Sequence, residues 1–169
     1  MGHANQPTRY KHIELHEIPP NGQGLAAQIA LGILQHLPDQ PLDSAEEVHQ
    51  LIEAMKIATA TAAARFADPA AMTVSIEELL DDESLRRAAA TIGPRAMVLP
   101  PAALPVGHDT VYLTTADADG MMVSFIQSNF RAFGSGVVIP GTGIAMQNRG
   151  SGFVLDPKHA NCVGPNTVS

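Results

Sequence analysis

The stretch that decides the fold of this chain is TVYLTTADADGMMVSFIQS, residues 110–128. Two runs rich in β-branched and aromatic residues flank Asp119-Gly120, a dipeptide typical of two-residue hairpin turns. The sequence therefore predicts two antiparallel strands joined at that dipeptide. Thr110 begins the first strand directly after a connector rich in Pro and Gly, residues 93–109, which is the kind of segment in which chains are cut.

Thr110 on its own carries little information, because threonine is a favoured strand residue. A threonine acts as a nucleophile without a neighbouring histidine only when its own α-amino group serves as the base. That amine, with a pKa of about 7.7–8.0, exists only if the bond between Asp109 and Thr110 is cut. The residues by themselves leave both interpretations open, a structural strand threonine and a nucleophile released by cleavage.

Helical patterns lie upstream of this hairpin. Ser44 and Ser75 each precede a Glu by three residues, the spacing of a capping box at a helix start. Pro38 and Pro69 end two of the segments, because proline disfavours helical backbone at and before its own position. The predicted helices span residues 25–37, 45–67, 76–80 and 84–92. Since the strands gather in residues 110–155, this order predicts an α+β fold.

The second predicted helix carries little side-chain bulk. Its alanines at 58, 60, 62, 63, 64 and 67 leave little side-chain bulk on any face of the helix, which predicts close packing against neighbours on more than one side. Its apolar residues also repeat at helical spacing. The apolar residues that we expect to share one stripe of the helix are Val48, Leu51, Ile52, Met55, Ala58 and Ala62.

Length, charge and cysteine content limit the possible functions. A chain of 169 residues suffices for one domain, and a net charge of −7 with ten scattered basic residues argues against nucleic-acid binding. No apolar run approaches the roughly 20 residues of a membrane-spanning helix. The single Cys162 excludes an internal disulfide framework and fits either the cytoplasm or the periplasm. With no Trp, two Tyr and five Phe, the chain is expected to be a piece of a larger protein.

Three other kinds of chemistry find little support. Among seven histidines only His12 and His16 are four residues apart, in a strand-like segment where that spacing does not define one helical face. No Gly-rich stretch is followed by a helix in the manner of a phosphate-binding loop, and no G-x-S-x-G elbow supports a Ser-His-Asp triad. We therefore expect neither a metal nor a cofactor.

Several motifs, in the same order, resemble those of the γ-glutamyltranspeptidase family, which belongs to the N-terminal-nucleophile hydrolases. The upstream stretches that match are Pro19–Gly24, Ile52–Lys56 and Ala67–Pro69. From the hairpin onward the matches are Thr110-x-Tyr112, Asp117-x-Asp119-Gly120, Val123-Ser124, Phe133-Gly134-Ser135-Gly136, Gly143-Ile144, Asn148 and Phe153. The resemblance covers about residues 10–165, and its specificity comes from the order of the motifs.

The resemblance implies a precursor that cuts itself before the threonine. Residues 1–109 would be the C-terminal part of a large-subunit-like region, and residues 110–169 the N-terminal part of a small-subunit-like region. The freed Thr110 would attack a γ-glutamyl amide of the glutathione type, and the acyl group would pass to water or an amino-acid acceptor. The fold implied is a four-layer αββα sandwich, to which this chain would contribute helices and two or more central strands.

The same resemblance assigns roles to three further residues. Ser128 takes, by spacing, the place of a second hydroxyl that helps the nucleophile, and Asn148 and Arg149 fall in the substrate-binding region. The family pattern has an acidic residue where this chain has Gly152, which leaves less to hold a glutamyl ammonium group. An acylase of the same fold that acts on a non-glutamyl amide is therefore one alternative. A catalytically silent structural module is another.

Two parts of the family's active site have no counterpart in this sequence: the segment that forms the oxyanion hole, and an arginine that grips the substrate carboxylate. Loss of an oxyanion donor costs about a hundredfold or more in rate, so we expect the chain alone to be inactive. Its expected partners are the remaining parts of its own precursor, a small-molecule amide and an acceptor, with no nucleic acid and no membrane span.

Overall fold

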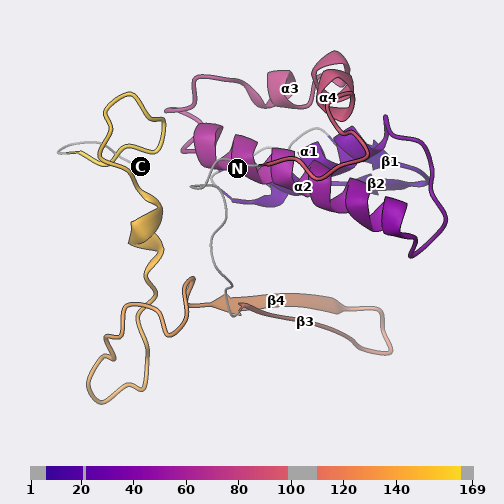
Figure 1. The fold of residues 1–169 in the computed structure, drawn as a ribbon. Coiled ribbons are helices and arrows are strands. Elements are labelled where there is room, and N and C mark those ends of the chain that lie inside the picture. The colour runs from indigo at the N-terminus through magenta and orange to yellow at the C-terminus, as the bar shows by residue number, and fades with distance from the viewer. Residues whose placement is uncertain (1–6, 21, 99–109, 165–169) are drawn as a thin grey trace. The chain divides into compact units, whose positions relative to one another are not determined.

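The computed structural model describes residues 7–20, 22–98 and 110–164. In chain order the elements are β1 (Thr8–Tyr10), β2 (Ile13–Leu15), α1 (Gly24–Leu34), α2 (Ala45–Arg65), α3 (Ile76–Leu79), α4 (Asp82–Ala89), β3 (Thr110–Ala116), β4 (Met122–Ser128) and the 3₁₀ helix η1 (Arg149–Gly152). They belong to two compact units, a helical unit with the described residues up to 98 and from 154 to 164, and a hairpin unit, 110–153 (Figure 1). Helices and strands thus occupy separate parts of the sequence, as predicted.

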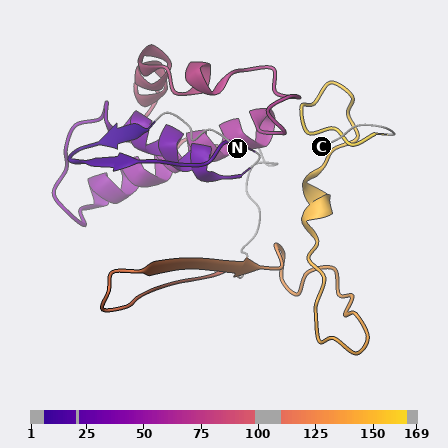
Figure 2. The same cartoon turned by 180° about the vertical axis from the view of Figure 1, so that it is seen from behind.

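The helical unit is built around α1, which packs beside α2 and also contacts α4 and β1 (Figures 1 and 2). Leu25 and Ile33 of α1 and Ala58 of α2 are fully buried. A Cβ atom on Gly32 would lie 2.7 Å from Cδ1 of Leu85 on α4. The missing side chain at Gly32 therefore lets α1 and α4 approach closely, and together these contacts give the unit its own apolar core.

The helix starts lie where the capping residues predict them. Ser44 Oγ accepts a hydrogen bond from the Glu47 amide at 3.1 Å, and α2 begins at the residue after Ser44. Ser75 and Glu78 form a complete capping box, in which the two side-chain to amide hydrogen bonds measure 3.1 and 2.8 Å. Each cap satisfies amide groups that the first helical turn leaves without partners.

The predicted helix ends at residues 37, 67 and 92 are too late, because α1, α2 and α4 end at residues 34, 65 and 89. After α1 and α4 the chain continues in tighter turns, with hydrogen bonds from Leu37 to Leu34 and from Ile92 to Ala89. Such three-residue turns commonly finish a helix and carry the apolar pattern beyond it. The predicted start of the last helix is also wrong, since Asp81 caps the Ser84 amide at 3.0 Å and α4 begins at residue 82.

The apolar stripe predicted on α2 is buried only in part. Its four larger members are 44–53% exposed in the described structure, namely Val48, Leu51, Ile52 and Met55. The residues that α2 buries are Glu53, Ala54, Ala58 and Ala62. The small side chains let α2 lie close to α1, so the alanine face rather than the bulky face enters the core.

The hairpin unit confirms the predicted strand pair but corrects its turn. β3 and β4 run antiparallel, in a register that pairs Ala116 with Met122 at the turn end. Beyond that pair the Asp117 amide donates to the Met121 carbonyl at 3.1 Å, and Gly120 has a φ of +87°. The predicted two-residue turn is therefore wrong. The loop also includes Ala118, because the left-handed residue of a three-residue loop falls on Gly120.

Both faces of this hairpin carry apolar side chains. Neighbouring residues of a strand point to opposite faces, so Val111 and Leu113 lie on one face, and Tyr112 and Ile126 on the other. All four are about half or more exposed, and no described residue of 110–153 is buried. Strands with apolar residues on both faces are typical of a sheet that is covered on both sides.

Part of the predicted connector lies outside the described residues. The predicted connector at residues 93–109 is described only as far as residue 98, and Asp109 lies outside the described residues. The division at 109/110 concerns chain cleavage and stays a prediction. None of the helices in the described ranges is long and apolar enough to cross a membrane.

Candidate active site

β3 and β4 bring Thr110 and Ser128 together across 18 residues of sequence. The two residues are direct partners in the strand register, and Thr110 Oγ1 donates a hydrogen bond to Ser128 Oγ at 3.0 Å. Ser128 Oγ also accepts a hydrogen bond from the Phe130 amide at 3.0 Å. The threonine oxygen is thus tied to a second hydroxyl that the next loop holds in place. The catalytic roles of both residues stay predictions.

Asn148 anchors the loop that follows β4. Its Oδ1 atom accepts a hydrogen bond from the Arg131 amide at 2.9 Å, and its Nδ2 atom donates to the carbonyls of Arg131 and Gly134 at 3.3 and 3.0 Å. Its own amide donates to the Asn129 carbonyl at 3.2 Å. Both N–H groups of this side chain are therefore engaged with the backbone. This geometry positions the loop, and substrate binding by Asn148 stays a prediction.

Gly134 is a second fixed point of the same loop. It has a φ of +74°, and a Cβ atom there would overlap the carbonyl oxygen of Met146. That carbonyl accepts hydrogen bonds from the Ser135 amide and hydroxyl at 2.8 and 2.9 Å. The close approach requires glycine, which explains why the Phe133–Gly136 motif carries one at this position.

Arg131 and Arg149 approach the same aromatic ring from different parts of the chain. Their guanidinium carbons lie 5.4 and 5.5 Å from the centroid of the Phe130 ring. Neither arginine forms an ion pair within the described ranges of the chain. The sequence predicted Arg149 as a binding residue but missed Arg131, because only the folded loop brings Arg131 to the same ring.

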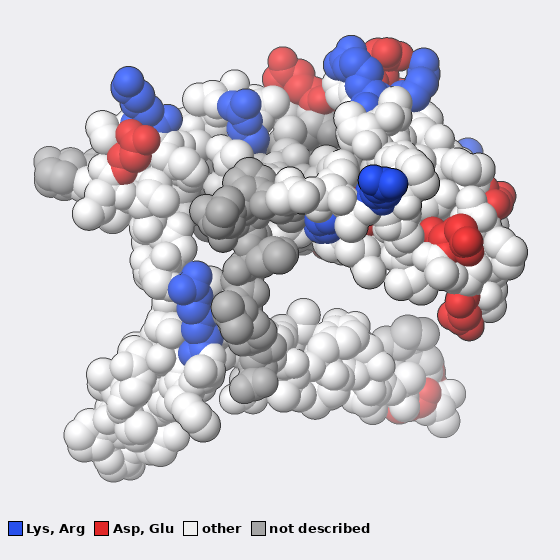
Figure 3. Space-filling view, viewed as in Figure 1, with Lys and Arg blue, Asp and Glu red and all other residues white. Residues whose placement is uncertain are grey.

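The charges of the hairpin unit are segregated. In residues 110–153 the acidic side chains are Asp117 and Asp119, both at the turn, and the basic ones are Arg131 and Arg149, beyond the other end of the strands. Seven-residue strands separate the two ends by about 20 Å. Figure 3 shows basic atoms over the segment after β4 and acidic atoms over the turn. Within residues 110–153 the two arginines therefore follow the end of β4 that holds Ser128, and both aspartates lie at the opposite turn.

A buried ion pair in the helical unit was not predicted from the sequence. Glu53 is 1% exposed, and its carboxylate oxygens lie 2.8 and 3.1 Å from Nζ of Lys56. Lys56 Nζ also donates to the Met97 carbonyl at 2.5 Å, and the Met97 amide donates to Glu53 at 3.0 Å. The pair holds both backbone groups of Met97. The residues belong to the matched stretch Ile52–Lys56, but that stretch alone does not show what they contact.

Two effects act on the pKa of Glu53 in opposite directions. Burial raises the pKa of the Glu53 carboxyl, but hydrogen bonds from Lys56 and from the Met97 amide lower it and outweigh the effect of burial. The pKa therefore lies below its ordinary value, and the carboxylate stays ionised at neutral pH. An ionised, fully engaged carboxylate suits an anchor for the chain at Met97 rather than a general acid.

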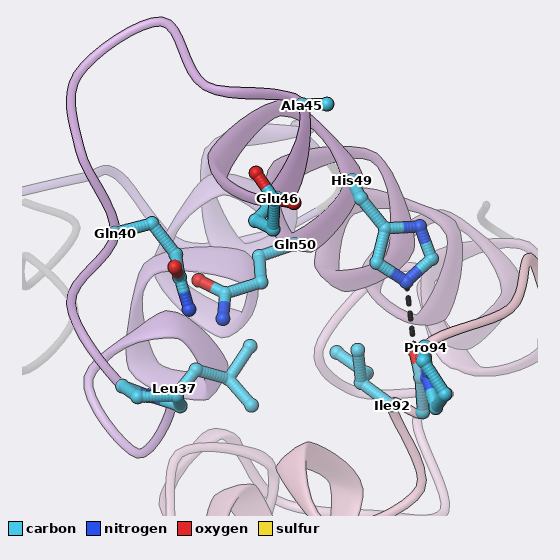
Figure 4. Close-up of a pocket in the computed structure, with 10 residues that line it drawn as sticks. Leu37, Gln40, Ala45, Glu46, His49, Gln50, Ile92 and Pro94 are labelled. Carbon is cyan, nitrogen blue, oxygen red and sulfur yellow. Dashed lines mark hydrogen bonds between the residues drawn. The ribbon is translucent and has the colours of Figure 1, made fainter.

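A pocket of about 500 Å³ lies between the end of α1, the start of α2 and the segment after α4 (Figure 4). Leu37 and Ile92 form its apolar part, and His49 Nε2 lies 2.7 Å from the Gly93 carbonyl at its side. None of the predicted catalytic or binding residues lines it. It is a feature of the helical unit.

The predicted family is confirmed by comparison with known proteins. The family model described as gamma-glutamyltranspeptidase matches residues 3–167. The chain belongs to the γ-glutamyltranspeptidase family. A solved structure, the cephalosporin acylase from Bacillus halodurans, is similar with a TM-score of 0.81 and 48% sequence identity, over 95% of this chain and 29% of that one.

Two curated relatives show how much of such a protein the chain represents. The glutathione hydrolase-like YwrD proenzyme of Bacillus subtilis is 39% identical, over 92% of this chain and 30% of that protein. The oxamate amidohydrolase proenzyme of Klebsiella pneumoniae is 40% identical, over 89% of this chain and 28% of that protein. The chain therefore spans less than a third of the length of the relatives that it matches. Both are described as proenzymes.

Proposed function

We propose that this chain forms the central part of a self-processing amidohydrolase in which Thr110 is the nucleophile. One observation carries the proposal: Thr110 begins β3, and its Oγ1 atom lies 3.0 Å from Ser128 Oγ. The family match across the whole region and the proenzyme relatives support the same reading. The proposal does not depend on the identity of the substrate.

In the first step, Thr110 Oγ1 attacks the carbonyl carbon of Asp109. The carbon–nitrogen bond breaks, the nitrogen takes up the hydroxyl proton, and an ester links the two residues. Water then hydrolyses that ester, which leaves a carboxylate on Asp109 and restores the hydroxyl of Thr110 beside a new α-amine. An amine with a pKa of about 7.7–8.0 is partly neutral at physiological pH and can serve as the base.

In the second step, the same hydroxyl attacks the amide of a substrate. The Thr110 amine takes the hydroxyl proton and passes it to the leaving nitrogen, and the acyl group remains as an ester on Thr110. Water or an amino acid then accepts the acyl group. Ser128 would orient the attacking oxygen, because its hydroxyl contacts Thr110 and is itself held by the Phe130 amide.

The remaining parts of the precursor would complete the fold. Apolar side chains on both faces of the hairpin support a place for β3 and β4 inside a sheet with a layer on each side, as in a four-layer αββα sandwich. The exposed apolar side chains of α2 would offer a second surface for the rest of the protein, namely Val48, Leu51, Ile52 and Met55. Without those parts the chain would lack oxyanion donors, so the isolated 169-residue chain should not hydrolyse γ-glutamyl-p-nitroanilide.

Two classes of substrate are possible, and they differ in the acyl group of the amide. A γ-glutamyl amide fits the family name. An acylase acting on a non-glutamyl amide is favoured by Gly152, which stands where the family pattern has an acidic residue, and by the relatives described as an oxamate amidohydrolase and an acylase.

Mass spectrometry of the full-length protein tests the nucleophile. The wild type should appear as two polypeptides that meet at Asp109/Thr110, and Thr110→Ala should remain intact. Thr114→Ala is the matched control, since this threonine lies on the same strand and face and should be processed normally. An intact wild-type chain, with Thr110→Ala behaving identically, would show instead a catalytically silent module.

A further inference from the structure

The segment that follows the hairpin unit returns to the helical unit. Residues 154–164 form one compact unit with the described residues up to 98. In that unit His159 Nε2 lies 3.2 Å from the carbonyl oxygen of Ala63 on α2, although the two residues are 96 positions apart in the chain. Figures 1 and 2 both show this segment beside the end of α2. A part of the chain that comes after Thr110 is therefore bound to a helix that comes before it.

The ring of His159 is oriented by its own loop. The Asn161 amide donates a hydrogen bond to Nδ1 of this ring at 3.0 Å, so Nδ1 is an acceptor and carries no proton. The proton of the neutral ring is then on Nε2, the atom that faces the Ala63 carbonyl. One nitrogen of the ring thus binds the loop, and the other donates to the helix.

The carbonyl that His159 binds belongs to the last turn of α2. This helix ends at Arg65, and the carbonyls of a last turn have no partner within their own helix. The Phe66 amide donates to the carbonyl of Ala62 at 2.9 Å, and His159 supplies the donor for that of Ala63. Histidine is among the residues that commonly bind carbonyls at a helix C-terminus. The contact therefore caps α2 from a distant part of the chain.

The loop that carries His159 is closed by its own backbone. The Val154 amide donates to the Asn161 carbonyl at 3.1 Å, and the Val163 amide donates to the Val154 carbonyl at 3.0 Å. Between these two hydrogen bonds the Cys162 amide donates to the His159 carbonyl at 3.1 Å. A loop that is already closed loses little conformational entropy when it binds. The segment therefore presents a preformed surface to α2.

We propose that residues 154–164 form a clasp by which the polypeptide that begins at Thr110 is held on α2 of the polypeptide that ends at Asp109. This inference rests on the proposed cleavage before Thr110, because that cut turns the contact of His159 with Ala63 into a contact between two polypeptides. The partner that the clasp fits is the other product of the same precursor. His159 is the residue that positions the clasp on the helix.

A protease site inserted between residues 103 and 104 of the 169-residue chain tests the clasp without self-cleavage. The chain also carries Thr110→Ala, so that only the added protease cuts it. After digestion the two fragments should co-elute in size-exclusion chromatography, and the fragments of a chain that ends at residue 153 should separate. Fragments of the 169-residue chain that separate would overturn the proposal, as would fragments of the shortened chain that still co-elute.

His159→Asn assigns the contact to one residue. The shorter side chain keeps an acceptor for the Asn161 amide, but it has no group that reaches the Ala63 carbonyl. The Kd between the two fragments, measured by sedimentation velocity, should rise by about threefold to tenfold, the range for one neutral hydrogen bond. His12→Asn, at an exposed histidine of the helical unit, should keep the Kd of the parent chain. An unchanged Kd in His159→Asn would overturn the role of His159.

Two further measurements separate the clasp from misfolding and from the function of Thr110. Circular dichroism of each uncut variant checks that its helices are retained. Nitrogen NMR should show the Nε2–H tautomer of His159 in the digested chain as in the uncut one, and loss of this tautomer on digestion would contradict the clasp. A full-length protein that never cuts itself would overturn the proposed function, whereas the digestion tests the clasp itself.

Discussion

The helical and hairpin units bury their apolar residues to very different extents. In the helical unit, Leu25 and Ile33 are fully buried, and Gly32 lets α4 approach α1. In the hairpin unit, none of the described residues 110–153 is buried, although both faces of β3 and β4 are apolar. Helices satisfy their own backbone hydrogen bonds and need one packed face. A two-stranded hairpin, in contrast, is at best marginally stable by itself.

The helical unit thus has its own core, whereas the hairpin unit contains the residues that are proposed to be catalytic. The hydroxyl pair, both arginines and the anchored loop all lie in residues 110–153. A site on strands that later enter a covered sheet would be formed only when the rest of the protein is present.

The largest loss of stability is expected when a buried leucine of the helical unit is truncated, and an exposed leucine of the hairpin unit serves for comparison. In the 169-residue chain, Leu25→Ala should lower the free energy of unfolding by about 2–5 kcal/mol, because it removes a fully buried side chain. Leu113→Ala, at a residue that is 47% exposed, should change it by less than about 1 kcal/mol. Urea unfolding followed by circular dichroism measures both.

The same leucines sharpen the comparison in the full-length protein. If the rest of the protein covers the hairpin, the cost of Leu113→Ala should rise toward that of Leu25→Ala. A cost that stays small in the full-length protein would show that the hairpin remains exposed, contrary to its proposed place inside a covered sheet.

Breaking the buried ion pair should have the next largest effect. Lys56→Met leaves the Glu53 carboxylate without its cation, and removing one partner of a buried pair costs about 3 kcal/mol or more. The Met97 amide should also exchange faster with deuterium, since its anchor is lost. Lys158→Met is the control for a lysine without such a role, and equal stability of the two variants would contradict the anchor.

The same pair predicts a pH dependence. The folded protein holds the pKa of Glu53 below its value in the unfolded chain, which is about 4.3. This contribution to stability is therefore fully present above that pH and is lost as the pH falls through the lower folded pKa. The free energy of unfolding, measured at a series of acidic pH values, should fall less steeply with decreasing pH in Glu53→Gln than in the wild type. Parallel curves for the two proteins would contradict a lowered pKa of Glu53.

Alanine substitutions at two glycines with positive φ distinguish the cost of backbone strain from the cost of steric overlap. Gly134→Ala should destabilise the full-length protein by about 2 kcal/mol or more, because the left-handed conformation costs about 1–2 kcal/mol and the new Cβ atom also meets the Met146 carbonyl. Gly120→Ala should cost only the first part, since nothing lies near a Cβ atom there. Equal melting temperatures for the two variants would contradict the close approach at Gly134.

The smallest effect is expected at the helix caps. Ser44→Ala should cost about 1 kcal/mol, because it removes the cap of a 21-residue helix that packs on the core. Ser75→Ala should cost less, since α3 has four residues and buries none of them. Urea unfolding of both variants measures the difference, and a larger cost for Ser75→Ala would be inconsistent with the packing described for α2.

The sequence alone predicted the parts of this protein that depend on local physics. Ser44 and Ser75 marked helix starts correctly, because a cap involves only residues within one turn. The hairpin at residues 110–128 followed from strand propensity and the Asp119-Gly120 dipeptide, although its loop has three residues and not two. The ordered motifs also identified the family, and the resemblance implied Thr110 and Ser128 as nucleophile and supporting hydroxyl. Their hydroxyls lie 3.0 Å apart, and their catalytic roles stay predictions.

The tertiary structure decided everything that depends on residues far apart in the chain. Periodicity placed the apolar residues of α2 on one stripe, but only the fold shows that its alanines pack on α1 while its larger side chains are exposed in the described structure. Met97 is held by Glu53 and Lys56 from 41 or more residues away. Arg131 joins Arg149 at one ring only because Asn148 binds the loop across 17 residues. Contacts of this kind arise from the path of the folded backbone, which local propensity and periodicity do not determine.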